Sequence, residues 1–457
     1  MGDEMTEQIM VPFEGDVSGV GELTWGQWEI WPSLRESLST SFSIGGWVEL
    51  PPGRTAADIA ADLRFLMSRH SSLRIRLQFA ADGRPQQAIA GSGEALLEVI
   101  DGGADPAQVA ADTYRRLDNR SALDCASDWP IRWAVIVSRG FATHLVSLIS
   151  HLAADGAGVG VMLDDLASRD PVTGLAPGPV TAVQPLELAR LQASPAATKQ
   201  SEAALRRWER LLGMVPTRKF PGPADHRRPR YWQVFYDSPA SFLAVQTVAA
   251  RTGVTTGTVL LAAYAVAQAR LTGSNPAVAQ LVVDNRFRPG FAQVVGQLCH
   301  FSLCVIDVAE ITIDEAVRRA HRSAMGAYKN AYCDPLRRRE LVARIGRERG
   351  EVPDIGTCFV NDRRMGHRRE PGDQPPGPAQ VLAARPSAFA KGYENDDGGE
   401  RCYLHINNEP DTIQYELLAD THDLSPANME AFLRGIEAVI VEAALDPAAP
   451  TAVEGNA

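Results

Sequence analysis

Residues 141–167 constrain the fold more than any other stretch, because a strand pattern there meets a helix pattern at a turn that carries functional side chains. Phe141–Ile149 is a largely apolar run that ends in polar and glycine residues, which is typical of a buried strand. A helix over 159–167 is predicted from apolar residues on one face: Val159, Met162, Leu163 and Leu166. His151 and Asp155 lie between the two, so a rigid strand aims them while a turn leaves them accessible.

Composition places the chain among ordinary globular proteins. It has 457 residues, 45% of them hydrophobic and 22% charged, and a net charge of −11. An acidic balance disfavours nucleic acid and anionic membranes as partners, and no uninterrupted apolar run predicts a membrane span. The six cysteines lack C-x-x-C spacing, so we expect no metal site, no disulfide scaffold and a cytoplasmic location.

Strand and helix patterns alternate irregularly along the whole chain, which predicts an α+β fold. Residues 170–200 are rich in proline and glycine and form the best candidate for a boundary between lobes. We therefore predict an N-terminal lobe over 1–175, which carries the His151 turn, and a C-terminal lobe over 176–457.

His151 is the candidate catalytic residue, because an imidazole titrates near neutral pH and suits a general base. It could take the proton of an amine or hydroxyl as that group attacks an activated acyl carbon. Asp155 could act directly, or hold the turn by pairing with an arginine from 69–76 or 286–288. A lone His-x-x-x-Asp-Gly pattern is weak evidence, because a structural histidine beside a turn is the commoner reason for it.

Five other segments, which follow one another over nearly the whole chain, make the pattern more specific than the central motif alone. They are Leu23–Trp31 with Gln27 and Trp31, Arg69–Arg76, Asp284–Arg286, Val295–Phe301 and Phe359–Asn361. Together with the His151 turn, they resemble the motifs of condensation domains of nonribosomal peptide synthetases. Those domains belong to the chloramphenicol-acetyltransferase-like superfamily of CoA-dependent acyltransferases, and the resemblance covers nearly the whole chain.

The resemblance implies two chloramphenicol-acetyltransferase-like lobes in a V arrangement with a central tunnel. It implies a free-standing condensation enzyme of natural-product biosynthesis, which transfers an acyl or aminoacyl group to an amine or hydroxyl acceptor. The donor would be a thioester on the phosphopantetheine arm of an acyl or peptidyl carrier protein, or on coenzyme A, with no bound cofactor. The acceptor would be a small amine or alcohol, free or carrier-bound, and the enzyme a monomer.

The same resemblance groups His151, Asp155 and Gly156 as the catalytic residues. His151 is then the base or orienting group. Asp155 has a structural role, paired with Arg286 or Arg74. Gly156 directs its N–H towards the oxyanion that develops during acyl transfer.

Ser150 and His300 depart from the family's pattern. The family usually has a second histidine where Ser150 stands, and we expect Ser150 to fill a packing or hydrogen-bonding place. His300 stands where the family often has asparagine, and with Asn361 it is a candidate for lining the substrate tunnel. Two alternatives stay open: a catalytically silent module that recruits a partner protein, and a related CoA-dependent or lipid-type acyltransferase.

Residues 337–349 are rich in arginine, beginning with Arg337, Arg338 and Arg339. Such a helix could meet the acidic surface of a carrier protein, although a charge run is more often a solvated helix face.

Overall fold

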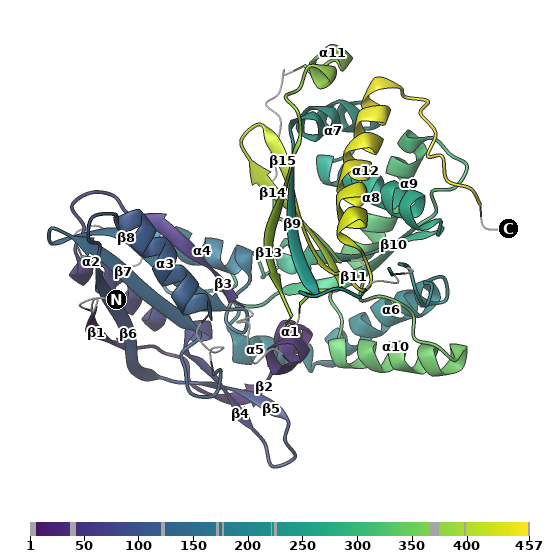
Figure 1. The fold of residues 1–457 in the computed structure, drawn as a ribbon. Coiled ribbons are helices and arrows are strands. Elements are labelled where there is room, and N and C mark those ends of the chain that lie inside the picture. Colours follow the sequence, from purple (N-terminus) through teal and green to yellow (C-terminus); the bar gives the residue numbers. More distant parts are fainter. Residues whose placement is uncertain are drawn as a thin grey trace. The chain divides into compact units, whose positions relative to one another are not determined.

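The computed structural model describes residues 6–36, 43–119, 124–170, 173–175, 178–220, 222–223, 226–357, 359–364, 374–396 and 399–455. They form two compact units (Figure 1). Unit 1 comprises 1–199 together with 284–300, and unit 2 comprises 200–283 and 301–457. Cys358, one of the six cysteines considered above, lies outside the described residues.

This partition differs from the predicted division at residue 175. The proline-rich stretch folds onto unit 1, because helix α5 (Pro185–Gln192) contributes Leu188 to a small core with Val294 and Leu298. The chain also returns to unit 1 after residue 283. Composition shifts along a sequence do not reveal such a return, since it depends on which distant residues pack together.

Unit 1 is built on a five-stranded sheet of order β1-β6-β7-β8-β3. Its strands are β1 (Thr6–Glu14), β6 (Ser92–Asp101), β7 (Ile131–Ser138), β8 (Phe141–Ser150) and β3 (Ser43–Glu49). Strands β6 and β7 run parallel, and the other neighbours run antiparallel. The predicted strand over 141–149 is therefore confirmed as β8, between two partners.

Helices cover both faces of this sheet. On one face, α2 (Ala56–Arg69) and α4 (Gly156–Ala167) pack Leu63, Leu66 and Met162 against β1, β6 and β7. On the other face, α3 (Pro106–Asn119) packs Ala110 and Leu117 against alternate residues of β7 and β8. Since successive side chains of a strand point to opposite faces, one apolar strand supplies both cores.

A three-stranded sheet of order β2-β5-β4 completes unit 1. It contains β2 (Gly19–Glu22), β5 (Pro85–Ile89) and β4 (Ile75–Phe79), and β4 follows the short helix η1 (Ser71–Arg74). The motif segment Leu23–Trp31 runs into α1 (Trp25–Glu36), in which Trp25 and Trp28 are buried.

Unit 2 is built on a seven-stranded sheet of order β11-β10-β12-β14-β15-β9-β13. The strands are β11 (Cys299–Ile306), β10 (Ala277–Asp284), β12 (Phe359–Asp362), β14 (Cys402–Glu409), β15 (Thr412–Asp420), β9 (Tyr231–Ser238) and β13 (Ala388–Asn395). The 3-10 helix η2 (Asn285–Phe287) follows β10 directly.

Four helices form the main core of unit 2 on one face of this sheet. They are α7 (Pro239–Thr252), α8 (Thr256–Thr272), α9 (Ile313–Lys329) and α12 (Pro426–Leu445). The apolar, alanine-rich helix α8 is buried along most of its length. On the opposite face, α6 (Pro195–Leu212) and α10 (Pro335–Arg349) pack Trp208 and Leu341 against β10 and β11. The short helix α11 (Pro378–Leu382) lies beside α7 and α12.

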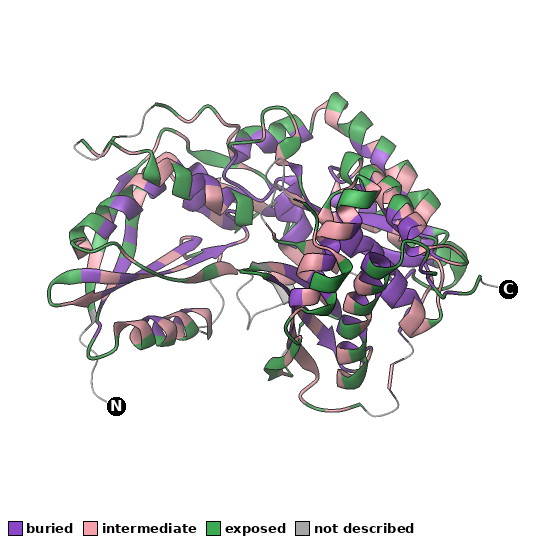
Figure 2. Cartoon of the chain, turned by 90° about the horizontal axis from the view of Figure 1, so that it is seen from above, coloured by how far each residue is buried: buried purple, intermediate pink, exposed green. Residues whose placement is uncertain are grey.

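Buried residues concentrate in the strands and on the inner sides of the helices, and exposed residues follow the outer sides and loops (Figure 2). None of the helices in the described residues has both the length and the apolar character that crossing a membrane requires.

Candidate active site

The His151 turn begins where β8 ends. Ser150, the last residue of the strand, is 1% exposed, and its Oγ accepts a hydrogen bond from the Leu152 N–H at 3.2 Å. Its carbonyl oxygen accepts from the Ala153 N–H at 2.9 Å, which closes the turn. His151 follows and is half-buried. These contacts support a packing and hydrogen-bonding place for Ser150.

Asp155 is the N-cap of α4, and its carboxylate is surrounded by donors. Oδ1 accepts from the backbone N–H of Gly158 at 2.8 Å. Oδ2 accepts from the N–H groups of Leu298 at 2.8 Å and Cys299 at 3.1 Å. Two nitrogens of Arg286 add contacts at 2.8 and 2.9 Å. A carboxylate this fully engaged joins two segments of the chain, which is a structural task.

Arg286 is therefore the arginine that pairs with Asp155. It also contacts Asp284 at 2.8 Å and donates to the Val294 carbonyl at 2.8 Å. Burial opposes its charge, but the charges of Asp155 and Asp284 outweigh burial, so the pKa of the Arg286 guanidinium is raised. An ion pair this buried, 8% and 2% exposed, is costly to break from one side.

Arg74, the other candidate partner, lies in unit 1 but serves a different purpose. Its guanidinium donates to the carbonyls of Met67 at 2.6 Å, Ser68 at 2.8 Å and Ala90 at 2.8 Å. Burial lowers its pKa. The sequence could not distinguish the two arginines as partners of Asp155, because each lies in a motif segment.

The neighbouring residues Arg69 and His70 hold α4 from another side. Arg69 donates to Asp165 at 2.7 and 3.2 Å, and Nε2 of His70 lies 3.3 Å from the same carboxylate. Hydrogen bonds from His70 and Arg69 hold the pKa of Asp165 far below its usual range. The Arg69–Arg76 motif is thus a scaffold that anchors the helix after the turn.

Segment 294–299 approaches the His151 turn closely. The Gly296 carbonyl accepts from the Asp155 N–H at 3.3 Å. Oε1 of Gln297 lies 3.4 Å from Nδ1 of His151. This approach depends on Gly26 in α1, because a Cβ there would overlap the Gln297 carbonyl oxygen.

Helix α1 also holds the turn directly. The buried Gln27 side chain donates to the Leu152 carbonyl at 3.2 Å and accepts from the Thr24 N–H at 2.8 Å. A cavity of about 10 Å3 remains between these groups, lined by Gln27, Leu152, Gln297 and neighbouring residues. That volume holds one water molecule at most, so the turn is closely backed by protein.

The glycines of the turn differ in what they require. A Cβ on Gly158 would lie 3.0 Å from Nη2 of Arg286 and 3.2 Å from Oδ1 of Asp155. A Cβ on Gly156 would meet nothing within 4 Å. The steric demand for glycine therefore falls on Gly158, while Gly156 opens α4 as an exposed residue.

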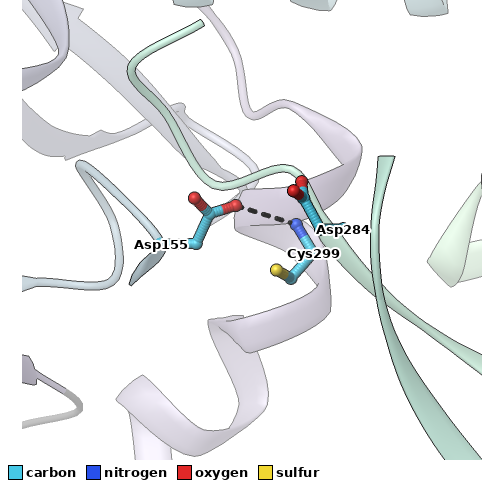
Figure 3. Close-up of side chains that lie close together, drawn as sticks. All are labelled: Asp155, Asp284 and Cys299. Atoms are coloured by element: carbon cyan, nitrogen blue, oxygen red, sulfur yellow. Dashed lines mark hydrogen bonds between the residues drawn. The ribbon is translucent and has the colours of Figure 1, made fainter. Parts of the chain in front are cut away.

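Asp155, Asp284 and Cys299 bring potential metal ligands within 4.8 Å of one another (Figure 3). Burial and the charges of the two aspartates raise the pKa of the Cys299 thiol well above its usual value, so it stays protonated at neutral pH. Arg286 already supplies positive charge to both carboxylates. The chemistry of this group fits an arginine-centred ion pair better than a metal, and the expectation of no metal stays a prediction.

The remaining predicted residues lie on other strands. His300, on β11, is 0% exposed, which favours packing over contact with a substrate. Asn361 is half-buried on β12, directly opposite His405 of β14 in the sheet register. A role in lining a tunnel stays a prediction for both His300 and Asn361.

His405 belongs to a polar group with Arg363 and Glu416 that the sequence analysis did not predict. Its Nε2 lies 3.0 Å from Nη2 of Arg363, and Arg363 also contacts Glu416 at 3.2 Å. Burial, with the charge of Arg363, lowers the pKa of His405 well below its usual value. Rings of Phe359, Tyr403 and His405 follow one another at 5.3 and 4.2 Å on the same sheet face.

Gln297 and Gly26 were also missed. Both lie inside motif segments, at positions whose residue type gave no chemical signal. Only the tertiary structure shows that Gln297 contacts His151 and that Gly26 leaves space for the backbone of Gln297.

Comparison with known proteins supports one family. A family model for the condensation domain matches residues 36–337. Cyclosporin synthetase simA of Tolypocladium inflatum is 26% identical over 330 residues, which cover 68% of this chain and 2% of that protein. AMB antimetabolite synthetase AmbB of Pseudomonas aeruginosa is 27% identical over 213 residues, covering 46% of this chain and 16% of that protein. The chain thus spans a small part of these relatives.

Solved structures share the fold at low identity. The SgcC5 protein from Streptomyces globisporus matches with a TM-score of 0.71 at 19% identity, over 94% of this chain and 100% of that chain. The X-domain from teicoplanin biosynthesis matches with 0.71 at 17% identity, over 95% and 97%. The chain-release condensation domain of the enacyloxin polyketide synthase matches with 0.70 at 18% identity, over 96% and 84%. These likenesses confirm the predicted fold class; the V arrangement and the tunnel stay predictions.

Proposed function

Because this chain belongs to the condensation-domain family, whose model matches residues 36–337, we propose that it is an acyltransferase of natural-product biosynthesis. It would transfer an acyl or aminoacyl group to an amine or hydroxyl acceptor, forming an amide or an ester. The donor would be a thioester on the phosphopantetheine arm of an acyl or peptidyl carrier protein, or on coenzyme A. Action as a free-standing, monomeric and cytoplasmic enzyme stays a prediction.

The observation that carries this proposal is the placement of His151. Its imidazole stands at the end of β8, on a turn that Gln27, Asp155 and segment 294–299 all brace. Asp155, the other titratable group of the turn, engages its carboxylate with backbone and guanidinium donors. Proton transfer at this site therefore falls to the histidine.

The proposed reaction has two steps. His151 takes a proton from the acceptor nitrogen or oxygen as that atom attacks the thioester carbonyl carbon. The carbonyl oxygen then carries a negative charge, which the N–H of Gly156 at the positive end of α4 can stabilise. Collapse of this intermediate breaks the carbon–sulfur bond, and the protonated His151 returns the proton to the leaving thiolate.

Docking of the carrier protein on α10 receives limited support. Arg338 is buried, lies 5.1 Å from the centre of the Trp208 ring and donates to the Phe301 carbonyl at 3.2 Å. Replacing it would test packing and not docking. The exposed arginines of α10 line a groove of about 590 Å3 beside α6, where Glu202 and Glu209 pair with Arg337 and Arg344. A docking role on this face stays a prediction.

Mass spectrometry of the products tests the function. We would offer a panel of acyl-carrier and acyl-CoA thioesters with small amines and alcohols to wild type, His151→Ala and His144→Gln. We expect a new amide or ester from wild type, and a loss of roughly 10²-fold or more in His151→Ala. His144 lies on the same strand and bonds to Thr143, so its variant should retain activity.

Equal product from wild type and His151→Ala would remove His151 from the chemistry. A wild type that binds carrier protein but yields the same product-free mixture as His151→Ala would favour the silent recruiting module.

A further inference from the structure

Gln297 is a buried side chain whose only side-chain hydrogen bond within the described residues goes to the candidate catalytic histidine. It is 6% exposed, and its Oε1 lies 3.4 Å from Nδ1 of His151. The pattern of motifs does not select this position by residue type. A buried amide needs a partner, and here the partner is the imidazole.

The backbone around Gln297 is held from both sides. Before it, the Gly296 carbonyl accepts from the Asp155 N–H at 3.3 Å. After it, the N–H of Leu298 donates to the Asp155 carboxylate at 2.8 Å. On the third side, the Gln297 carbonyl oxygen packs directly against the backbone of Gly26, where there is no space even for a Cβ. Because the backbone is held, the Gln297 side chain extends towards His151 from a fixed Cα position.

The chemistry of this contact decides which imidazole nitrogen is basic. A neutral imidazole has one N–H, and the carbonyl oxygen of an amide accepts but does not donate. A hydrogen bond with Oε1 as the acceptor requires the proton of His151 on Nδ1, which leaves the lone pair on Nε2. An amide is uncharged, so it orients the ring without the rise in histidine pKa that a carboxylate at the same distance would cause.

We propose that Gln297 is a positioning residue that holds His151 in the Nδ1-protonated tautomer and leaves Nε2 to act as the base. This inference rests on the proposed function, in which His151 accepts the proton of the acceptor substrate. It also gives Asp155 an indirect part: by binding Leu298 and Gly296 it places Gln297, and through Gln297 it places the imidazole.

NMR of the 15N-labelled full-length protein tests the inference without any substrate. The His151 resonances are identified by their absence in His151→Ala. We expect the Nδ1-protonated tautomer in wild type and a shift towards the Nε2-protonated form in Gln297→Leu. In Gln297→Glu, which keeps the side-chain shape, a nearby carboxylate should raise the pKa of His151 by roughly one unit or more. An unchanged tautomer and an unchanged pKa in both variants would overturn the proposal.

Kinetics supply the second readout. We expect Gln297→Leu to lower kcat by about 10- to 10²-fold with KM within about twofold, because it disturbs orientation and not binding. Gln297→Glu should move the acidic limb of the kcat/KM profile to higher pH. If wild type shows no acyl transfer, the proposed function fails while the NMR result still decides the tautomer.

Gln280→Leu serves as the matched control. Gln280 is another buried glutamine with a backbone acceptor, the Ile355 carbonyl at 2.6 Å, and it belongs to unit 2. Its variant should leave the His151 resonances and pH profile unchanged. Loss of the His151 tautomer in this control as well would mean that general destabilisation, and not the Gln297 contact, moves the histidine.

Discussion

At the scale of residues, the need for a glycine at 158 is steric. A methyl group there would press on Nη2 of Arg286, which cannot retreat because Asp155, Asp284 and Val294 hold its guanidinium. Alanine normally favours a helix over glycine by up to about 1 kcal/mol. The crowding should outweigh that gain, since overpacking a tight site costs about 1–3 kcal/mol.

We therefore expect Gly158→Ala to lower the melting temperature and to reduce acyl transfer. Gly160→Ala is the control, because a Cβ on Gly160 in the same helix would meet nothing within 4 Å. Calorimetry should show the control at or above the wild-type melting temperature. Equal melting temperatures for Gly158→Ala and Gly160→Ala would mean that Arg286 can give way without cost.

At the scale of elements, α1 supports the His151 turn. It holds Leu152 through the Gln27 side chain and lets segment 294–299 approach through Gly26. The atom closest to Gly26 belongs to the backbone of Gln297. A Cβ on Gly26 would overlap its carbonyl oxygen. A side chain there must therefore displace the whole segment.

Gly26→Ala should consequently cost more than Gly158→Ala, at about 3 kcal/mol or above, and should abolish the contact between Gln297 and His151. Urea unfolding and the His151 NMR signals measure the two effects. Gly46→Ala on the edge strand β3 is the control, because a Cβ there would meet nothing within 4 Å. Wild-type stability in Gly26→Ala would show that α1 is not packed on this segment in solution.

At the scale of the whole molecule, each unit contains a buried histidine that resists protonation. Burial lowers the pKa of His70 in unit 1, and burial together with Arg363 lowers that of His405 in unit 2. The unfolded chain binds protons near pH 6.5 that the folded chain does not. The free energy of unfolding should therefore fall as pH drops below about 6.5, by up to about 1.4 kcal/mol per pH unit for each histidine.

His405→Gln should flatten this dependence, because glutamine does not titrate and its oxygen can still accept from Arg363. Urea unfolding of both proteins from about pH 7.5 to about pH 5 measures the slopes. Parallel curves would mean that His405 has the same pKa in the folded and the unfolded chain.

The sequence by itself determined the local elements and singled out the His151 turn as the candidate site. An apolar run predicted β8, and helical periodicity predicted the core of α4, because both patterns depend only on residues close together in the sequence. The helix begins earlier than predicted, at Gly156, because the Asp155 carboxylate caps its first turn. The order of the motifs predicted the family, and the matching family model confirmed it.

Only the tertiary structure decided which distant groups meet at that turn. Arg286 and not Arg74 pairs with Asp155, Gln297 reaches His151, and residues 284–300 return to unit 1 after the first strands of unit 2. The physical reason is the same in each case. These contacts join residues that lie far apart in the sequence, and the chemistry of a single position does not say which distant segment the fold will place beside it.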